Sequence, residues 1–270
     1  MDKVENDGME AGRAPIVTLP VAPDGPVHRA LWIRGPVSEP ITATGFARID
    51  VHFGAMPHDP FPLCNADGWS ARLGFIGQLS RALSCQFRPG PVATLVVELE
   101  AAAAVALAGK APLKAFSDRR TALETLLGAK AGDLYDRLEV MPVEEAPAFL
   151  ADWLVRTLPR TPRCRLTPAL RRLWEAGGEA PLETTAALLG LGRRQFERCF
   201  RAEIGLSPKR YARIIRCQSA ARSCAAAERG AFAEIAVTHG YADQAHMGRD
   251  FRQFLGMTPV EVRRRGYALR

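Results

Sequence analysis

The chain has 270 residues, 47% of them hydrophobic, which is enough for two domains that each bury their own core. No run approaches the roughly 20 apolar residues of a membrane-spanning helix. The first residues also lack the basic start and apolar centre of a secretion signal, so we expect a cytoplasmic protein without membrane contact.

The net charge of +7 is distributed unevenly along the chain. Residues 163–270 contain 20 Lys and Arg against 10 Asp and Glu, whereas residues 1–162 contain 16 against 19. All the excess positive charge therefore lies in the C-terminal part, which favours a polyanion as partner for that end. The six cysteines form no CxxC pair and lie largely in periodic segments, which argues against a disulfide framework.

The first half is predicted to contain strands followed by helices. Residues 1–26 are rich in Gly, Pro and acidic side chains and are expected to form a flexible lead-in. From Val27 to Phe87, Pro and Gly recur every few residues, and apolar and polar residues alternate from Leu79 to Phe87, which indicates short strands. Beyond the turn Arg88-Pro89-Gly90, four segments have the apolar spacing of helices. They are Leu95 to Leu107, Thr121 to Leu127, Gly132 to Leu138 and Val143 to Leu158. We therefore predict a mixed α+β sensor or dimerisation domain over residues 27–158.

A break in the helical pattern follows this domain. Two prolines and several basic residues lie close together just after Leu158, so residues 159–165 are predicted to be a linker. Beyond it the strand signals disappear, and residues 166–270 are predicted to be an all-α domain.

This C-terminal part contains a repeat with an offset of 51 residues. The pattern Phe-Arg, three residues, then Gly-Leu/Met-Ser/Thr-Pro occurs at Phe200 to Pro208 and again at Phe251 to Pro259. An Ala-x-x-x-Gly element precedes each copy. A small Ala lets two helices cross closely, and the Gly permits the left-handed backbone of a tight turn, so each copy is predicted to be a helix-turn-helix unit.

The second helix of each unit should bury one face and expose the other. Phe196, Cys199 and Phe200 form the inner stripe of the first copy, and Met247 and Phe251 belong to that of the second. The outer face is expected to carry Arg194, Glu197, Arg198 and Arg201 in the first copy, and Gln244, His246, Arg249 and Asp250 in the second.

One long helix is predicted between the two units, from Pro208 to about Ala227. Its length would be about 30 Å at 1.5 Å per residue. Because major grooves on one side of B-DNA lie about 34 Å apart, this connector is long enough to place the two second helices in successive grooves.

These motifs resemble the AraC/XylS family of bacterial transcription regulators. The similarity covers about residues 166–266 and rests on the duplication, on Gly-Leu-Ser-Pro-x-x-Tyr at Gly205 to Tyr211, and on Gly-Tyr-x-Asp-Gln-x-His at Gly240 to His246. Gly192 stands where the family commonly has a Ser cap, and Ala245 stands where it often has Ser. The residues that the resemblance places at bases or phosphates are Arg194, Glu197, Arg198, Gln244, His246 and Arg249.

Further basic side chains near these positions are expected to contact phosphates. They are Arg193, Arg201, Lys209 and Arg210. The predicted function is thus a sequence-specific regulator that binds double-stranded DNA, with a first half that senses a small molecule or a partner. RNA polymerase and a second copy of the chain are further candidate partners, and no cofactor is expected.

Two alternatives concern the first half. It could be a metal-dependent enzyme using His28, His52 and His58, although these form no closely spaced histidine pair. It could instead be a dimerisation module without a ligand. No Gly-x-Ser-x-Gly motif is present either, so nothing supports a nucleophile. From the histidine spacing and the missing motif together, we predict no metal site, no catalytic residue and no enzymatic activity.

Overall fold

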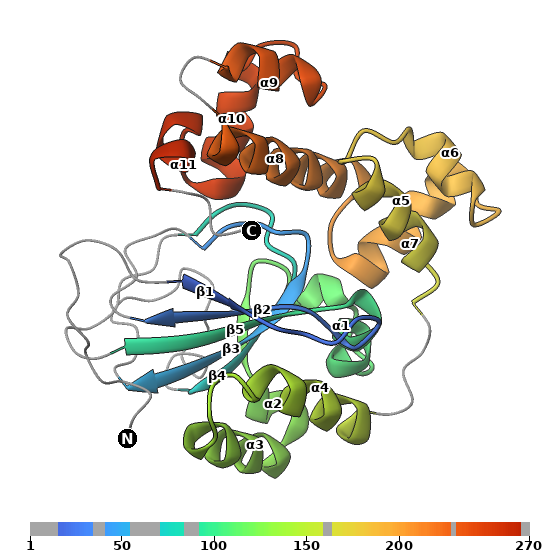
Figure 1. Ribbon diagram of the computed structural model, residues 1–270. Helices are drawn as coiled ribbons and strands as arrows, with labels where there is room; N and C mark the ends of the chain where they lie inside the picture. The colour runs from blue at the N-terminus through green and yellow to red at the C-terminus, as the bar shows by residue number, and fades with distance from the viewer. Residues whose placement is uncertain are drawn as a thin grey trace.

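The computed structural model describes residues 16–34, 41–54, 71–83, 92–158, 164–227 and 231–265. Within these residues a six-stranded sheet precedes a series of helices (Figure 1). The strands are β1 (Ile16–Leu19), β2 (Val27–Arg34), β3 (Ala47–Gly54), β4 (Leu73–Ile76), β5 (Val92–Leu99) and β6 (Arg120–Ala122). The helices that follow in the first half are α1 (Ala101–Ala108), the 3-10 helix η3 (Leu113–Phe116), α2 (Leu123–Leu127), α3 (Ala129–Val140) and α4 (Ala146–Thr157).

The C-terminal part of the described chain is entirely helical. Its helices are α5 (Thr167–Glu175), α6 (Leu182–Ala187), α7 (Arg193–Ile204), α8 (Pro208–Ala226), α9 (Phe232–Thr238), α10 (Gln244–Leu255) and α11 (Pro259–Arg265). This arrangement confirms the predicted fold class, with a mixed first half and an all-α region whose helices alternate with tight turns. None of the helices described is both long and apolar enough to cross a membrane.

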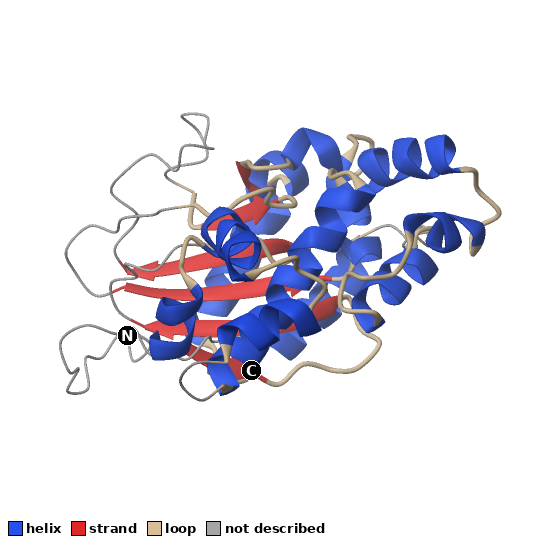
Figure 2. Ribbon diagram, turned by 90° about the horizontal axis from the view of Figure 1, so that it is seen from above, coloured by secondary structure: helices blue, strands red, loops and turns tan. Residues whose placement is uncertain are grey.

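The sheet has the strand order β1-β2-β5-β3-β4-β6 with antiparallel pairing throughout. The central strand β5 places Val97 opposite Ala30 of β2 and Ile49 of β3. These three side chains belong to the apolar core that helices α1 to α4 complete. Figure 2 shows the strands and the surrounding helices from above.

Parts of the first half differ from the prediction. Leu95 to Leu107 is not one helix, because its first residues belong to β5 and α1 starts only at Ala101. The β-branched residues of β5 and its alternation of buried apolar and polar side chains suit a central strand. Strand β1 lies within the segment predicted as a flexible lead-in, and it pairs with β2.

The strand expected from Leu79 to Phe87 is not found in the described part of that segment, residues 79–83. The nearest strand is β4, and the described residues beyond it form a loop whose Leu83 makes an isolated bridge with Ile41. Cys85 and Phe87 lie outside the described residues, as do residues 159–163 of the predicted linker. The position of the domain boundary therefore stays a prediction.

The sheet-containing half packs directly against the C-terminal helices (Figure 1). Leu79 and Leu83 share an apolar cluster with Ile214 of α8 and Phe254 of α10. Two backbone amides also close the last turn of α10: Ala43 N donates to the Phe254 carbonyl at 2.8 Å, and Ala82 N donates to the Gln253 carbonyl at 2.8 Å. The first half therefore supports the helices that carry the candidate site.

Candidate nucleic-acid interface

The first helix-turn-helix unit consists of α6, a tight turn and α7. Gly190 in the turn has φ of 64°, and the amide of Leu191 donates to the Ala186 carbonyl at 3.2 Å. Ala186 is buried where the two helices meet. Gly205 ends α7 in the left-handed conformation that the sequence predicts there.

The second unit repeats this geometry in α9, a turn and α10. Gly240 also has φ of 64°, and Tyr241 N donates to the Ala236 carbonyl at 2.9 Å. Asp243 caps α10, because its Oδ1 accepts a hydrogen bond from His246 N at 2.6 Å. Gly192 provides no such side-chain cap for α7. Both predicted helix-turn-helix units are confirmed.

A capped helix follows each unit, as the Ser/Thr-Pro step predicts. The Ser207 hydroxyl accepts a hydrogen bond from Arg210 N at 3.2 Å at the start of α8. At α11, Glu261 N donates to Thr258 Oγ1 at 3.2 Å, and Thr258 N donates to Glu261 Oε2 at 2.7 Å. The hydrogen bonds from Thr258 lower the pKa of the Glu261 carboxyl below its ordinary value.

The predicted inner stripes are buried in both second helices. Phe196 and Phe200 of α7 meet edge to face, and Phe200 meets Tyr211 of α8 in the same way, with ring centroids 5.4 Å apart in each pair. In α10 the buried stripe contains Met247 and Phe251. Each second helix is therefore held from behind by an aromatic core, which leaves its other face open.

Helix α8 connects the two units and confirms the predicted connector. Its 19 residues span about 28 Å at 1.5 Å per residue. Figure 1 shows α6 and α7 near one end of α8, with α9, α10 and α11 toward the other.

The outer faces of α7 and α10 carry arginines that have no partner among the described residues. Arg194 and Arg198 of α7 and Arg249 of α10 are exposed, and they make no hydrogen bond or ion pair with any residue that the structure describes. Gln244 is exposed at the first position of α10. Arg198 and Arg249 are equivalent in the 51-residue repeat, so the same guanidinium group projects from the same place in both units.

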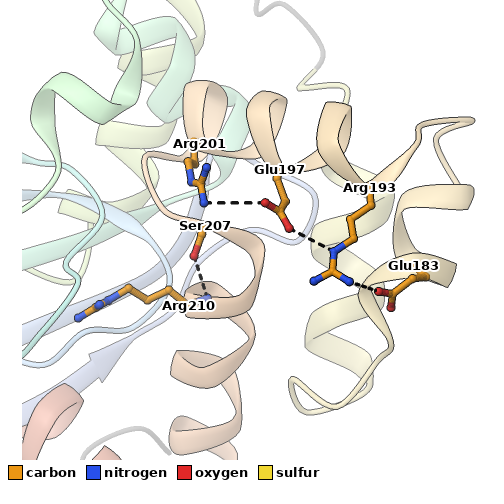
Figure 3. Close-up of polar contacts among 6 residues, drawn as sticks. All are labelled: Glu183, Arg193, Glu197, Arg201, Ser207 and Arg210. Carbon is orange, nitrogen blue, oxygen red and sulfur yellow. Dashed lines mark hydrogen bonds and ion pairs between the residues drawn. The ribbon is translucent and has the colours of Figure 1, made fainter.

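A chain of ion pairs runs along the other edge of α7 (Figure 3). Arg193 Nη1 lies 2.8 Å from Glu183 Oε1 of α6, and Arg193 Nε lies 3.4 Å from Glu197 Oε1. Arg201 Nη2 lies 3.9 Å from Glu197 Oε2. The side chains of Arg193 and Arg201 are 62% and 55% exposed. Exposed pairs of this kind contribute at most about 1 kcal/mol each, so both arginines can exchange these partners for phosphates.

A groove lies between the two units, with a volume of about 490 Å³. It brings together Lys209 and Arg216 of α8 with His246 of α10, and Glu179 also lines it. Lys209 is exposed, whereas His246 is half-buried against the ring of Tyr241.

Two predicted positions need correction. The Arg210 guanidinium donates from Nε at 3.1 Å and from Nη2 at 2.8 Å to the Ser80 carbonyl, and Figure 3 shows it directed away from Arg193 and Arg201. It therefore joins the two halves of the protein instead of extending the basic surface. Asp250 does not face outward, because its side chain is 1% exposed and Oδ1 lies 2.6 Å from Arg213 Nη2.

Arg252 is an exposed side chain on α10 that the sequence analysis did not single out. It occupies the position equivalent to Arg201, because the two arginines are 51 residues apart and each immediately follows the repeated Phe. Applying the repeat offset to every predicted contact would have identified it.

The histidines of the metal alternative do not meet at one site within the described residues. His28 stacks on Phe46 and contacts Glu100, while His52 Nε2 lies 2.6 Å from Asp50 Oδ2. His58 lies outside the described residues. In the part of the chain that is described, no group of three or more His, Cys, Asp or Glu is arranged to hold a metal ion.

Asp50 lies in a buried cluster of charged side chains that strands β3 and β6 contribute. Its Oδ2 also accepts a hydrogen bond from Arg120 Nε at 2.8 Å. Burial alone would raise the pKa of this carboxyl, but the charges of Arg120 and His52 outweigh burial and lower the pKa. Asp50 is therefore an ionised structural group.

Comparisons with known proteins agree with this geometry. Residues 185–265 match the family model of a helix-turn-helix domain. An uncharacterized HTH-type transcriptional regulator of Haemophilus influenzae is 32% identical over 83 residues, which span 31% of this chain and 28% of that protein. The chain thus matches less than a third of that relative's length.

Several solved structures are also similar, and two of them are described here. One is a transcriptional regulator from Chromobacterium violaceum described as containing an AraC-type DNA-binding domain, at 24% identity over 39% of this chain and 95% of that one, with a TM-score of 0.35. The other is ToxT from Vibrio cholerae, at 9% identity over 88% of this chain and 99% of that one, with a TM-score of 0.51. The likeness to ToxT concerns the fold and extends over both halves of the chain.

Proposed function

We propose that this chain, whose C-terminal region is a helix-turn-helix domain of the AraC type, is a sequence-specific DNA-binding transcription regulator. One observation carries the proposal: exposed guanidinium groups without a partner in the described part of the chain, those of Arg198 and Arg249, recur at the same position of two helix-turn-helix units. An arginine that is merely solvated need not recur at equivalent positions of a repeat. Two helices that both contact DNA bases are expected to carry equivalent side chains.

The chemistry of the outer faces suits DNA. A guanidinium group can donate two parallel hydrogen bonds to O6 and N7 of guanine in the major groove. We assign this role to Arg194, Arg198 and Arg249, with Gln244 and His246 at the start of α10 as further base or phosphate contacts. Arg193, Arg201 and Lys209 are assigned to phosphates, and Glu197 pairs with the two arginines when no DNA is bound.

The connector supports binding by one monomer to two neighbouring grooves. Helix α8 spans about 28 Å, close to the roughly 34 Å between major-groove faces on one side of B-DNA. The groove that contains Lys209 lies between the units, where the intervening phosphate backbone would pass.

The first half is proposed to act as the sensor of a small molecule or protein partner in the cytoplasm. Its loops contact α8 and the last turn of α10, so a change in these loops can reach the second reading helix. RNA polymerase and a second copy of the chain remain candidate partners.

A fluorescence anisotropy titration of the full chain tests the function. The ligands are a duplex recovered by genomic footprinting and a scrambled duplex of equal length, at 50 and 200 mM salt. We expect tight binding to the recovered site. The logarithm of the binding constant should fall with the logarithm of the salt concentration, with a slope of about −0.9 per neutralised phosphate. Affinity that is independent of salt, or equal for both duplexes, would contradict sequence-specific DNA binding.

A further inference from the structure

The second helices of the two helix-turn-helix units are equivalent position by position. With the 51-residue offset, the 12 residues of α7 align with the 12 residues of α10 without a gap. Every buried residue of α7 then aligns with a buried residue of α10. The pairs are Phe196 with Met247, Cys199 with Asp250, Phe200 with Phe251, and Ile204 with Leu255. Because the inner stripes coincide, the outer faces can be compared residue by residue.

One row of exposed residues runs along each outer face. Residues three or four positions apart lie on the same side of a helix. The members of the two rows are Arg194, Arg198 and Arg201 in α7, and Ala245, Arg249 and Arg252 in α10. The rows therefore carry the same side chain at two positions, and they differ at the first, where α10 has an alanine in place of an arginine.

The neighbouring positions differ in the same direction. Arg193 and Glu197 form an ion pair on α7 (Figure 3), and the equivalent residues of α10 are Gln244 and Gly248. Helix α7 contains four arginines and two glutamates, whereas α10 contains two arginines and one aspartate. The first of these helices is therefore rich in charge, and the second has uncharged side chains at its first two positions.

Gly248 allows α10 to approach DNA more closely than α7 can. A Cβ atom at Gly248 would have no described atom from elsewhere in the structure within 4 Å, so the surface is open there. Ala245 lies three residues earlier on the same side of the helix, and its methyl group can touch a base only where the backbone comes close to the groove floor. Glycine permits such a close approach, whereas Glu197 occupies the equivalent position of α7.

These side chains prefer different bases. An arginine donates two hydrogen bonds to O6 and N7 of guanine, a glutamine amide pairs with N6 and N7 of adenine, and an alanine methyl packs on the thymine methyl. Arg194 and Arg198 therefore select two G·C pairs under α7. Arg249 selects one G·C pair under α10, while Gln244 and Ala245 select A·T pairs.

We infer that one monomer binds a directional site, in which a G·C-rich half lies under α7 and a half that combines A·T pairs with one guanine lies under α10. The contrast between Arg194 in the first unit and Ala245 in the second carries this inference. It rests on the proposed function, because it names the bases that the same two helices contact. A site of this kind fixes the orientation of the monomer on the duplex.

Selection from a randomised duplex library by the full chain tests the inference. The random segment covers about 25 base pairs, which is more than two turns of 10–10.5 base pairs. We expect an enriched site with a G·C-rich half and an A·T-bearing half about one turn apart. Enrichment of no sequence would remove the proposed function together with the inference. An enriched site whose halves have the same base composition would overturn the directional site and leave sequence-specific binding intact.

Two substitutions assign the halves of the site to the helices. Ala245→Arg gives α10 the exposed row of α7, so one position of the A·T-bearing half should change its preferred pair from T·A to G·C. Arg194→Ala should remove the preference for guanine at one position of the G·C-rich half. Competition anisotropy with duplexes that differ at single base pairs measures both changes, each expected to be roughly fivefold or more because one arginine–guanine contact corresponds to about 5- to 160-fold in affinity. Unchanged preference at every position in either variant would overturn the assignment.

Ala233→Arg is the matched control for the added charge. Ala233 is exposed on α9, the first helix of the same unit, so the new arginine lies outside the exposed row of α10. This variant should bind the selected duplex and its single-pair variants with affinities changed by similar factors. A switch in base preference as large as that of Ala245→Arg would overturn the direct contact at residue 245. Unfolding curves verify that the variants fold, and the site selected by the wild-type chain tests the inference without any substitution.

Discussion

Arg213 of α8 and Asp250 of α10 form an ion pair with Nη2 and Oδ1 2.6 Å apart. Arg213 also donates to Gln253 Oε1 at 3.2 Å and lies over the ring of Phe254. The aspartate side chain is buried and the arginine side chain is 35% exposed, so the pair joins α10 to α8 on the buried side of α10.

Replacing one partner of this pair should cost more than replacing both. Arg213→Ala leaves a buried carboxylate unpaired, and we expect a loss of about 3 kcal/mol in unfolding free energy, at the low end for a buried pair because Arg213 reaches solvent. The double variant Arg213→Ala with Asp250→Ala should lose less. Urea unfolding of both variants measures this, with Lys209→Ala as an exposed control on the same helix. A double variant less stable than Arg213→Ala would disprove the pairing argument.

Arg198 and Arg249 should determine sequence preference. Each change to Ala removes a contact worth about 1–3 kcal/mol of discrimination, so the affinity ratio between specific and scrambled duplexes should fall roughly 5- to 160-fold. Competition anisotropy measures the ratio. Arg201→Ala is the matched control and should weaken both duplexes by similar factors. Parallel losses on both duplexes for Arg198→Ala and Arg249→Ala would assign those residues to phosphates.

Lys209 and Arg210 are neighbours with different expected roles. Lys209→Ala should reduce the magnitude of the salt slope by about one, since one phosphate contact is lost. Arg210→Ala should leave the slope unchanged and instead lower thermal stability, because two hydrogen bonds to Ser80 disappear. Salt titrations and melting curves of both variants separate the roles, and a reduced slope for Arg210→Ala would restore the original phosphate assignment.

The sequence predicts the C-terminal architecture well because its determinants are local. Gly190 and Gly240 fix the turns, and Ser207 caps a helix that starts one residue later. The errors concern residues whose partners are distant in sequence. Arg210 bonds to Ser80, 130 residues away, and no spacing rule along a helix can indicate that contact.

The first half was harder to predict for a related reason. Strand β5 is followed after one residue by α1, so a single apolar stretch contains both elements. Its neighbours β2 and β3 are distant in sequence, and their pairing turns the first part of the stretch into a central strand. The alternation of Thr94 and Glu98 with buried apolar residues was the available local signal.

Gly178 should not tolerate a side chain. It has φ of 81°, and a Cβ atom there would lie 2.1 Å from the Ala212 carbonyl oxygen of α8. Gly178→Ala should therefore destabilise the protein by about 2–5 kcal/mol through backbone strain and overpacking. Gly132 lies in α3 with open space around it, so Gly132→Ala should stabilise by about 0.5–1 kcal/mol. Denaturant unfolding compares the two, and a neutral Gly178→Ala would refute the close approach of this turn to α8.

Asp50 should contribute to acid unfolding. Its pKa is lowered in the folded protein, so its stabilising effect is present above the ordinary pKa of about 3.9 and is lost as the pH falls below it. The difference in unfolding free energy between wild type and Asp50→Asn should shrink from pH 6 to pH 2.5. Asp152 forms an exposed pair with Arg156, so Asp152→Asn should show a small difference that barely changes with pH. A constant difference for Asp50→Asn would mean that its charge is unimportant.

The two amides that close the last turn of α10 come from loops of the sheet-containing half, at Ala43 and Ala82. Separating the halves by proteolysis near residue 160 would leave those carbonyls and the apolar face around Phe254 open to water. The helical fragment would then be prone to self-association. Substitutions in either loop would therefore disturb the end of α10, even though neither loop belongs to the surface assigned to DNA.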